Sequence, residues 1–370
     1  MHFAVQKQKR VKLSIVTDPV KSASDAGLRY VCDDTPGIER KRAGKGFSYI
    51  GVDGKPIRDT QELNRFKGLV IPPAWTKVWI CPLPNGYLQA TGRDEKGRKQ
   101  YRYHPDWQKI RSQTKFNRMI AFGSTLPLIR QKTEEHLSLR KLSREKVLAT
   151  VVRLLETTCI RVGNVEYAKE NNSFGLTTMR NRHVDVSGSK VQFQFRGKSG
   201  VQHSLELNDR RIARIVKQCR DIPGYELFQY FDENGSRQTI SSEDVNAYLQ
   251  EITGEEFTAK DFRTWAGTVV AAQALTELGV FTSQTQAKKN ITQAIKQAAS
   301  QLGNRPATCR KYYVHPAIID AYLDGSLLPT MEQQKELETE EEPHALRKQE
   351  RGVLAVLSQQ LVQPKKPYAV

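Results

Sequence analysis

The spacing of the apolar residues changes at about residue 183, and this change limits the folds that the chain can adopt. Beyond this point apolar residues recur at every second position in two runs, at Val184 and Val186 and then at Val191, Phe193 and Phe195. Such alternation predicts strands with one buried face. Glycine-containing turns fall at 187–190 and 196–200, so we expect a three-stranded β insertion.

The segments on either side of this insertion have helical spacing instead. The segment 143–164 carries a broad apolar stripe, which we expect to end at Gly163; its members are Val147, Leu148, Val151, Val152, Leu154 and Leu155. After the insertion, Thr258 and Asp261 match the pattern of a helix start, and Gly279 is the expected stop. This part of the chain is therefore predicted to be mainly helical.

The chain before residue 110 has a different character. From about 29 to 103 it consists of short strand-like runs broken by turns, with hairpin signals at Asp53-Gly54 and Asn85-Gly86. The fold class is therefore predicted as α+β. We expect a β-rich, DNA-binding N-terminal domain at 1–110, a mainly helical catalytic domain at 111–330 and a charged tail at 331–370. The tail is expected to be an exposed helix or a partly disordered appendage.

The charge of the chain points to a polyanionic partner. With 58 Lys and Arg against 40 Asp and Glu, the formal net charge is +18, which indicates nucleic acid or an anionic membrane surface. The interval 91–118 alone holds nine Lys and Arg against three Asp and Glu. If 101–103 is a strand, Tyr101 and Tyr103 share one face and Arg102 lies on the other. A charged, solvated strand is the alternative to a nucleic-acid contact here.

The cysteines argue against a metal site. All five are scattered, without a C-x-x-C pair or a histidine cluster: Cys32, Cys81, Cys159, Cys219 and Cys309. This pattern favours a reducing compartment over a zinc site or a disulfide framework. The start of the sequence lacks the apolar run of a signal peptide, and no stretch approaches the roughly 18 apolar residues of a membrane span. We expect a cytoplasmic, nucleoid-associated protein without a membrane partner.

Three separated basic residues suggest chemistry on a phosphodiester. Taken singly, Arg161, Lys198 and Arg263 are ordinary surface charges or ion-pair partners. Taken together, two arginines could clamp the non-bridging oxygens of a phosphodiester, and a lysine on a hairpin could protonate a leaving alkoxide. A tyrosine could attack the phosphorus. Tyr312 and Tyr313 are both candidates, and the residues alone do not choose between them.

Several long motifs together resemble the type IB DNA topoisomerases, in the compact form of bacteria and poxviruses. The resemblance covers most of residues 28 to 325 and lies in PGIERKRAGKGFSYI, LVIPPAWTKVWICPLPNGYLQATGRDEKGRKQYRYH, CIRVGNVEYAKENNSFGLTT, FRGKSG, KDFRTWAGT and NRPATCRKYYVHP. These motifs follow one another in the order found in that family. The resemblance implies the tyrosine recombinase/topoisomerase IB catalytic fold.

The resemblance also implies a role for each candidate. Arg161 and Arg263 match the arginines that stabilise the pentacoordinate phosphorane, Lys198 matches the general acid, and Tyr313 matches the nucleophile. Asn304 occupies the position, nine residues before the nucleophile, where the family usually has a histidine and bacterial members have asparagine. Its amide can donate a neutral hydrogen bond but cannot carry a positive charge.

Further residues are expected to bind DNA. Gln100, Tyr101 and Tyr103 match the family's major-groove contact residues. The additional candidates are Arg98, Lys99, Tyr167 and Lys260. The expected partner is duplex DNA, held by a monomer that closes around it as a clamp.

The implied reaction is a transesterification without ATP or metal. The tyrosine forms a 3′-phosphotyrosyl link, the downstream duplex rotates, and the freed 5′ hydroxyl attacks back. No G-x-x-x-x-G-K-[ST] nucleotide motif is present in the sequence. A tyrosine recombinase is one alternative, although recombinases usually have H-x-x-R where this chain has Lys260 to Arg263 and lack its N-terminal motifs. A catalytically weak, basic DNA-binding protein is the other, and Asn304 is the feature that favours it.

Overall fold

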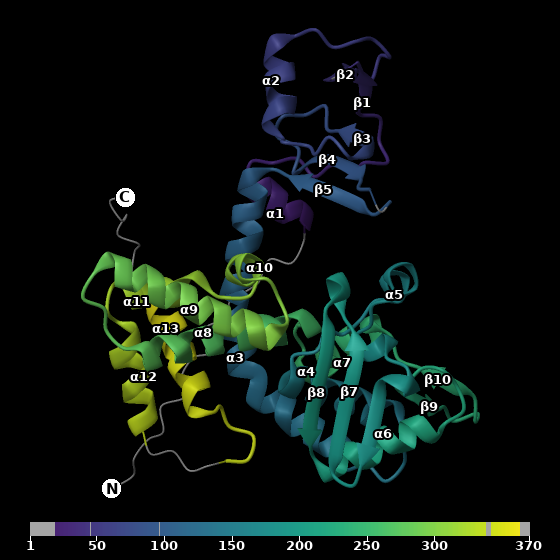
Figure 1. The fold of residues 1–370 in the computed structure, drawn as a ribbon, viewed down its shortest axis with the longest axis vertical. Helices are drawn as coiled ribbons and strands as arrows, with labels where there is room; N and C mark the ends of the chain where they lie inside the picture. The colour runs from purple at the N-terminus through teal and green to yellow at the C-terminus, as the bar shows by residue number, and fades with distance from the viewer. Residues whose placement is uncertain (1–18, 45, 96, 338–341, 363–370) are drawn as a thin grey trace, which may run out of the picture. The chain divides into compact units, whose positions relative to one another are not determined.

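The chain forms two compact units, Met1–Arg118 and Met119–Val370. Figure 1 draws the computed structural model, which describes residues 19–44, 46–95, 97–337 and 342–362; at 19, 22, 108–117 and 361–362 it describes the backbone alone. The fold mixes helices with small antiparallel sheets. Both the division at residue 118 and the boundary expected at 110 fall inside one long helix, α3 (Pro105–Leu137).

The first unit is built on a five-stranded antiparallel sheet. Its strands are ordered β2-β1-β3-β4-β5, with the bounds β1 (Ile38–Ala43), β2 (Gly46–Ile50), β3 (Thr76–Ile80), β4 (Leu88–Arg93) and β5 (Lys99–Tyr103). Helices α1 (Pro19–Asp25) and α2 (Thr60–Gly68) complete it, together with the first part of α3.

Turn chemistry and one aromatic side chain organise this sheet. After β2 the expected turn reverses the chain: Asp53 Oδ1 accepts a hydrogen bond of 3.0 Å from the Lys55 amide. Gly54 follows at φ 76°, a conformation that glycine adopts without strain. Phe66 of α2 is buried in a small core with residues from three strands, namely Ile38, Val78, Ile80 and Ala90. Burial of this apolar cluster holds α2 on the sheet.

The second unit is mainly helical. Its helices are α4 (Arg144–Thr158), α5 (Val165–Asn171), α6 (Arg210–Asp221), α7 (Ser242–Thr253), α8 (Ala259–Leu278), α9 (Gln284–Leu302), α10 (Pro306–Tyr312), α11 (Pro316–Leu323), α12 (Leu327–Glu336) and α13 (Lys348–Val362), with 3-10 turns η1 (Leu176–Thr178), η2 (Asn181–His183) and η3 (Lys198–Gly200). A short hairpin joins β9 (Gln229–Phe231) to β10 (Arg237–Thr239). None of the helices in the described part of the chain has the length and apolar character needed to cross a membrane.

The predicted three-stranded insertion is present in this unit. β6 (Val184–Ser187), β7 (Lys190–Arg196) and β8 (Gln202–Asn208) form an antiparallel sheet in that order. The alternation buries Val191, Phe193 and Phe195, as one face of a half-covered sheet requires. Within the unit, this sheet and α6 lie to one side, and α11, α12 and α13 gather on the other (Figure 1).

Helix α4 carries the central part of the core. All six of its predicted apolar residues are buried. The helix ends earlier than the sequence predicts, at Thr158, because Cys159 adopts a left-handed conformation with φ 55° and caps the last turn. Gly163 lies in the loop beyond, at φ 111°. For α8, by contrast, the predicted capping pair Thr258 and Asp261 and the stop at Gly279 are confirmed.

The C-terminal helix differs from the exposed helix that the sequence predicts. Val353, Val356 and Leu357 of α13 are buried in the main core. Helix α13 contacts α8, α11 and α12. The charged residues that dominate the preceding segment mask this apolar spacing in the sequence, while residues 338–341 and 363–370 lie outside the described part of the chain.

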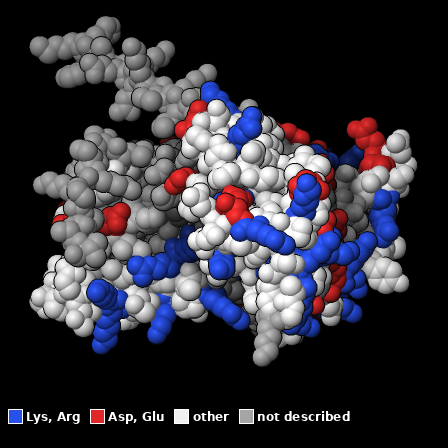
Figure 2. Space-filling model, turned by 90° about the horizontal axis from the view of Figure 1, so that it is seen from above, with Lys and Arg blue, Asp and Glu red and all other residues white. Residues whose placement is uncertain are grey.

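The surface is strongly basic. Figure 2 shows that Lys and Arg side chains clearly outnumber Asp and Glu side chains on the face in view. An excess of this kind creates a positive potential that attracts polyanions. The interior contains charge as well, and at one place it is balanced by opposite charge.

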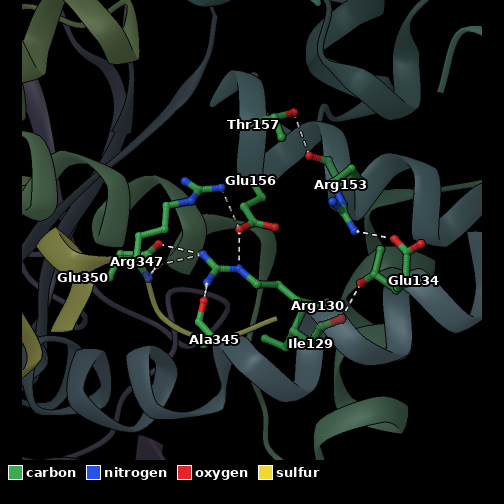
Figure 3. Close-up of polar contacts among 10 residues, drawn as sticks. Ile129, Arg130, Glu134, Arg153, Glu156, Thr157, Ala345, Arg347 and Glu350 are labelled. Atoms are coloured by element: carbon green, nitrogen blue, oxygen red, sulfur yellow. Dashed lines mark hydrogen bonds and ion pairs between the residues drawn. The ribbon is translucent and has the colours of Figure 1, made fainter. Parts of the chain in front are cut away.

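A buried ion network fixes α13 to the rest of the second unit. Figure 3 shows Arg130 of α3 between Glu156 of α4 and Glu350 of α13. Its Nε lies 2.7 Å from Glu156 Oε1, and its Nη2 lies 2.7 and 2.9 Å from the two Glu350 oxygens. Nη1 donates to the Ala345 carbonyl at 2.7 Å. The three ionic side chains are between 7% and 11% exposed. Removing the cation leaves two buried carboxylates whose remaining contacts come from Arg347, with its Nη2 3.8 Å from Glu156 and its amide donating to Glu350 at 2.8 Å.

We therefore expect Arg130→Met to lower the free energy of unfolding by about 3–5 kcal/mol. Urea denaturation of the full chain measures this. The matched control is Lys132→Met on the same helix, whose ion pair with Glu135 is 40% and 45% exposed and is expected to contribute less than about 1 kcal/mol. Equal losses in the two variants would contradict a stabilising role for the network.

Candidate active site

Helix α8 fixes the backbone of Tyr313. Tyr313 follows α10 directly, and its amide donates to the Cys309 carbonyl at 2.8 Å. Its carbonyl accepts a hydrogen bond of 3.3 Å from Thr268 Oγ1. Gly267 lies so close that a Cβ there would be 2.7 Å from the Tyr313 carbonyl oxygen. The absence of a side chain at residue 267 lets α8 pack directly against the tyrosine.

Arg263 lies beside this tyrosine, one helical turn before Gly267. The residue is 4% exposed. Its Nη2 donates to the Leu302 carbonyl at 2.7 Å, and its Nη1 donates to the Cys159 carbonyl. The guanidinium carbon lies 5.3 Å from the centre of the Tyr313 ring. A fixed positive charge therefore lies next to the candidate nucleophile.

Arg161 and Asn304 complete the cluster from two loops. Arg161 lies in the loop after α4, and its Nη2 donates to Asn304 Oδ1. Asn304 follows the C-cap of α9, where its amide donates to the Ala299 carbonyl at 2.8 Å. The Nδ2 of Asn304 is buried and has no hydrogen-bond partner among the described residues. An amide donor in this state can serve an oxygen of a bound substrate.

The two arginines influence each other. Burial lowers the pKa of Arg161, and the charge of Arg263 lowers it further. Tyr313 and Tyr167 act in the opposite direction, in part through a hydrogen bond between Arg161 and Tyr313. Even with a lowered pKa, the arginine side chain stays protonated. Two cations held together in a partly buried site favour the binding of an anion such as a phosphodiester.

Lys198 lies apart from these four residues. It is exposed at the tip of the β7–β8 hairpin, in η3. Its Nζ lies 5.5 Å from the centre of the Tyr167 ring, and in the described chain no hydrogen bond or ion pair joins it to the cluster. Tyr167, on α5, is itself close enough to Arg161 to affect its pKa. The structure thus brings together Arg161, Arg263, Asn304 and Tyr313 and leaves the lysine at their margin.

The two adjacent tyrosines have different surroundings. Tyr312 is 46% exposed, and Lys311 Nζ lies 5.3 Å from its ring centre. Tyr313 is half-buried and packs against the main core. Of the two, Tyr313 is the one next to both arginines.

Comparison with known proteins identifies the family. Residues 104–341 match the model of the eukaryotic DNA topoisomerase I catalytic core, and residues 46–94 match that of the bacterial DNA topoisomerase IB N-terminal domain. The DNA topoisomerase 1B of Acanthamoeba polyphaga mimivirus is 33% identical over 293 residues, which cover 77% of this chain and 87% of the relative. The chain belongs to the type IB DNA topoisomerases.

More distant relatives agree with this membership. The DNA topoisomerase 1B of vaccinia virus (strain Copenhagen) is 24% identical over 64% of this chain and 73% of its own length. The DNA topoisomerase 1 of Schizosaccharomyces pombe is 25% identical over 45% of this chain and 19% of its own length. Membership of the type IB topoisomerases selects an isomerase over the recombinase that the catalytic motifs alone left open.

In the first unit of this topoisomerase, the candidate DNA contacts lie on both faces of β5. The rings of Tyr101 and Tyr103 stack with centres 6.0 Å apart. Arg102 lies on the opposite face, over Trp75, as the alternation predicts. Gln100 has the same parity as Arg102 and therefore does not share the face of the two tyrosines.

Acidic partners hold the basic candidates of this strand and its turn. Arg98 Nη2 lies 2.7 Å from Asp94 Oδ2, and Gln100 Nε2 donates to the same oxygen at 3.0 Å. Lys99 Nζ lies 2.7 Å from Asp33 Oδ2. These side chains are partly or fully exposed. Such exposed pairs are weak and can exchange for phosphate.

Lys260, another candidate DNA contact, lies in the second unit. Lys260 is exposed on the first turn of α8, three residues before Arg263. Within the described part of the chain, no group of three or more His, Cys, Asp or Glu side chains could hold a metal ion.

Sequence reasoning missed the groups that hold Arg263. The carbonyls of Cys159 and Leu302 are backbone atoms, and no motif marks them. His203 was also missed, although its position five residues after Lys198 on the same hairpin was a signal available in the sequence.

The contact between Gly267 and Tyr313 gives a test of the site. Gly267→Ala is expected to slow plasmid relaxation by about 10²-fold, because a small displacement of a reacting group has an effect of that order. The clash with a backbone atom is also expected to lower the free energy of unfolding by about 1–3 kcal/mol, so relaxation is measured at a temperature where thermal unfolding shows the variant to be folded. Gly68→Ala is the control, since a Cβ at that helical position would have no atom within 4 Å. Unchanged relaxation by Gly267→Ala would contradict the importance of this packing.

Proposed function

We propose that the chain relaxes supercoiled duplex DNA by cutting one strand through Tyr313, allowing rotation and resealing the strand. The observation that supports this most directly is the convergence of Arg161, Arg263 and Asn304 on one tyrosine. Each of these three side chains can donate to phosphate oxygens, and together they favour the negative charge that develops at phosphorus.

The proposed reaction has two steps. Tyr313 Oη attacks the phosphorus and forms a 3′-phosphotyrosyl bond as the bond from phosphorus to the 5′ oxygen breaks, while the phenolic proton is lost to solvent. Lys198 donates a proton to the leaving 5′ oxygen. After rotation the 5′ hydroxyl attacks the phosphotyrosine and restores the strand. One phosphodiester replaces another of similar energy, so neither ATP nor a metal ion is required.

We further propose how the domains share this work. The N-terminal domain at 1–110 binds DNA through Arg98, Lys99, Gln100, Tyr101 and Tyr103. The catalytic domain at 111–330, of the tyrosine recombinase/topoisomerase IB fold, adds Tyr167 and Lys260. A monomer would close around the duplex as a clamp. The net charge of +18 supports a nucleic-acid partner, and a cytoplasmic, nucleoid-associated location follows from that partner.

Substitution of the two tyrosines tests the nucleophile. Tyr313→Phe is expected to lower plasmid relaxation by about 10³-fold or more, because it removes the oxygen that forms the covalent bond. Tyr312→Phe is expected to retain most of the activity. The assay contains EDTA and no ATP. A nicked suicide duplex should trap a covalent adduct that peptide mapping places on residue 313. An adduct on residue 312, or no relaxation by the wild type, would overturn the proposal.

Salt dependence tests the DNA interface. An interface with about six to ten phosphate contacts loses about 10³–10⁵ in affinity between 50 and 200 mM salt, because binding releases counterions. Fluorescence anisotropy with Tyr313→Phe measures binding without cleavage. Lys260→Ala is expected to reduce the slope of log K against log salt by about 1. Gln100→Ala replaces one uncharged side chain with another, so it should leave this slope unchanged. A flat dependence in the parent protein would contradict a phosphate-dominated interface.

A further inference from the structure

His203 lies against two loops at the edge of the candidate active site, the hairpin tip that carries Lys198 and the turn that carries Asn304. The proposed mechanism gives it no role. It is half-buried on β8, where it pairs with Phe195 of β7. The two rings stack with centres 4.9 Å apart and planes 14° from parallel. This pair is the last but one before the hairpin tip that carries Lys198.

The imidazole lies between two glycines. A Cβ on Gly197 would be 2.6 Å from both Cδ2 and Nε2 of His203, and a Cβ on Gly303 would be 2.5 Å from Cε1. Neither position can carry a side chain while the ring is in place. Gly197 directly precedes Lys198, and Gly303 directly precedes Asn304. The ring therefore bridges the backbone next to the lysine and the backbone next to the asparagine.

The two sides of this bridge are not equally fixed. The Gly303–Asn304 turn is tied to α9 by hydrogen bonds of 3.1 Å to the Ser300 carbonyl and 2.8 Å to the Ala299 carbonyl. At the hairpin tip, the Gly197 amide donates to Val201 at 2.7 Å and the Gly200 amide donates to Gly197 at 3.1 Å, so these bonds close the tip only on itself. Loss of the ring would consequently release the tip more than the turn.

We propose that His203 is a positioning residue that holds the Lys198 hairpin against the Gly303–Asn304 turn, so that the lysine reaches the leaving 5′ oxygen. The inference rests on the proposed role of Lys198 as general acid. The role proposed for His203 depends on the shape of its imidazole ring and not on its charge.

The electrostatics of the ring agree with a packing role. Burial lowers the pKa of His203, and the charges of Arg161 and Arg263 lower it further. The imidazole is therefore neutral at neutral pH and adds no third cation to the cluster. A neutral ring can lie against two backbones at little electrostatic cost.

The leaving group provides a test that a general loss of structure would not pass. A duplex with sulfur in place of the bridging 5′ oxygen expels a thiolate, which is a much weaker base than an alkoxide because thiols have far lower pKa values than hydroxyl groups. Its departure needs no general acid. Single-turnover cleavage is measured at saturating enzyme on matched suicide duplexes with oxygen or sulfur at this position.

On the oxygen substrate, we expect both His203→Ala and Lys198→Ala to slow cleavage by about 10²-fold or more. On the sulfur substrate, both variants should cleave within about threefold of the wild type, a margin well below the effect of a general acid. If Lys198→Ala is not rescued by sulfur, the proposed role of Lys198 fails and this inference fails with it. If Lys198→Ala is rescued and His203→Ala is not, the inference alone is overturned. Cleavage of the oxygen substrate by His203→Ala at the wild-type rate would also overturn the inference.

A second pair of variants tests the packing directly. Gly197 has φ −92°, which any residue adopts, and apart from His203 the nearest atom to a Cβ there is Phe195 Cε2 at 3.6 Å. Gly197→Ala should therefore slow oxygen-substrate cleavage only while the imidazole is present. The double variant Gly197→Ala/His203→Ala should cleave at about the rate of His203→Ala alone, because the new methyl occupies space that the ring has left. Independent, multiplied losses in the double variant would overturn the proposal.

Discussion

The candidate active site depends on one buried guanidinium. Arg263 donates to the carbonyls of Cys159 and Leu302, the C-cap of α4 and the last residue of α9. Carbonyls at helix C-termini carry partial negative charge and lack partners within the helix, so they suit a cation. Arg161 follows one of these carbonyls by two residues, and Asn304 follows the other by two. A single side chain thereby sets the position of both loops that supply the remaining donors.

This arrangement leaves the site short of negative charge. The two carbonyls satisfy Arg263 only in part, because its Nε is buried without a partner among the described residues. Asn304 Nδ2 is also buried without a partner among the described residues. The pKa of Arg161 is lowered, first by burial and further by repulsion from Arg263. Unpaired buried donors and neighbouring cations are both costly. A phosphodiester would relieve both, so binding energy is concentrated where the reaction develops charge.

The sequence predicted local structure well where one physical rule dominates. Alternation and glycine-containing turns together placed the β6–β8 insertion, and the Thr258–Asp261 capping pair placed the start of α8. Prediction from the sequence failed where tertiary contacts decide the local structure. Cys159 ends α4 before Gly163, and α13 packs into the core despite its charged surroundings. The motifs named the candidate residues, but only the fold brings residues 161, 263, 304 and 313 together. The role proposed for His203 depends on contacts with two glycines more than 100 positions apart, which no local pattern contains.

The position of Lys198 follows from the same electrostatics. An ammonium inside the cluster would add a third cation beside Arg161 and Arg263, and the repulsion would work against the fold before any DNA is bound. At the hairpin tip the lysine lies in solvent beside Tyr167 instead, and in the proposed mechanism it would approach once a phosphate has neutralised the arginines. The role proposed for Lys198 also requires a positioned hairpin tip, because a general acid must come within hydrogen-bond reach of the leaving oxygen. In the role proposed for it, the neutral ring of His203 at the base of the tip would meet both needs, because it would limit where the hairpin can go and adds no charge.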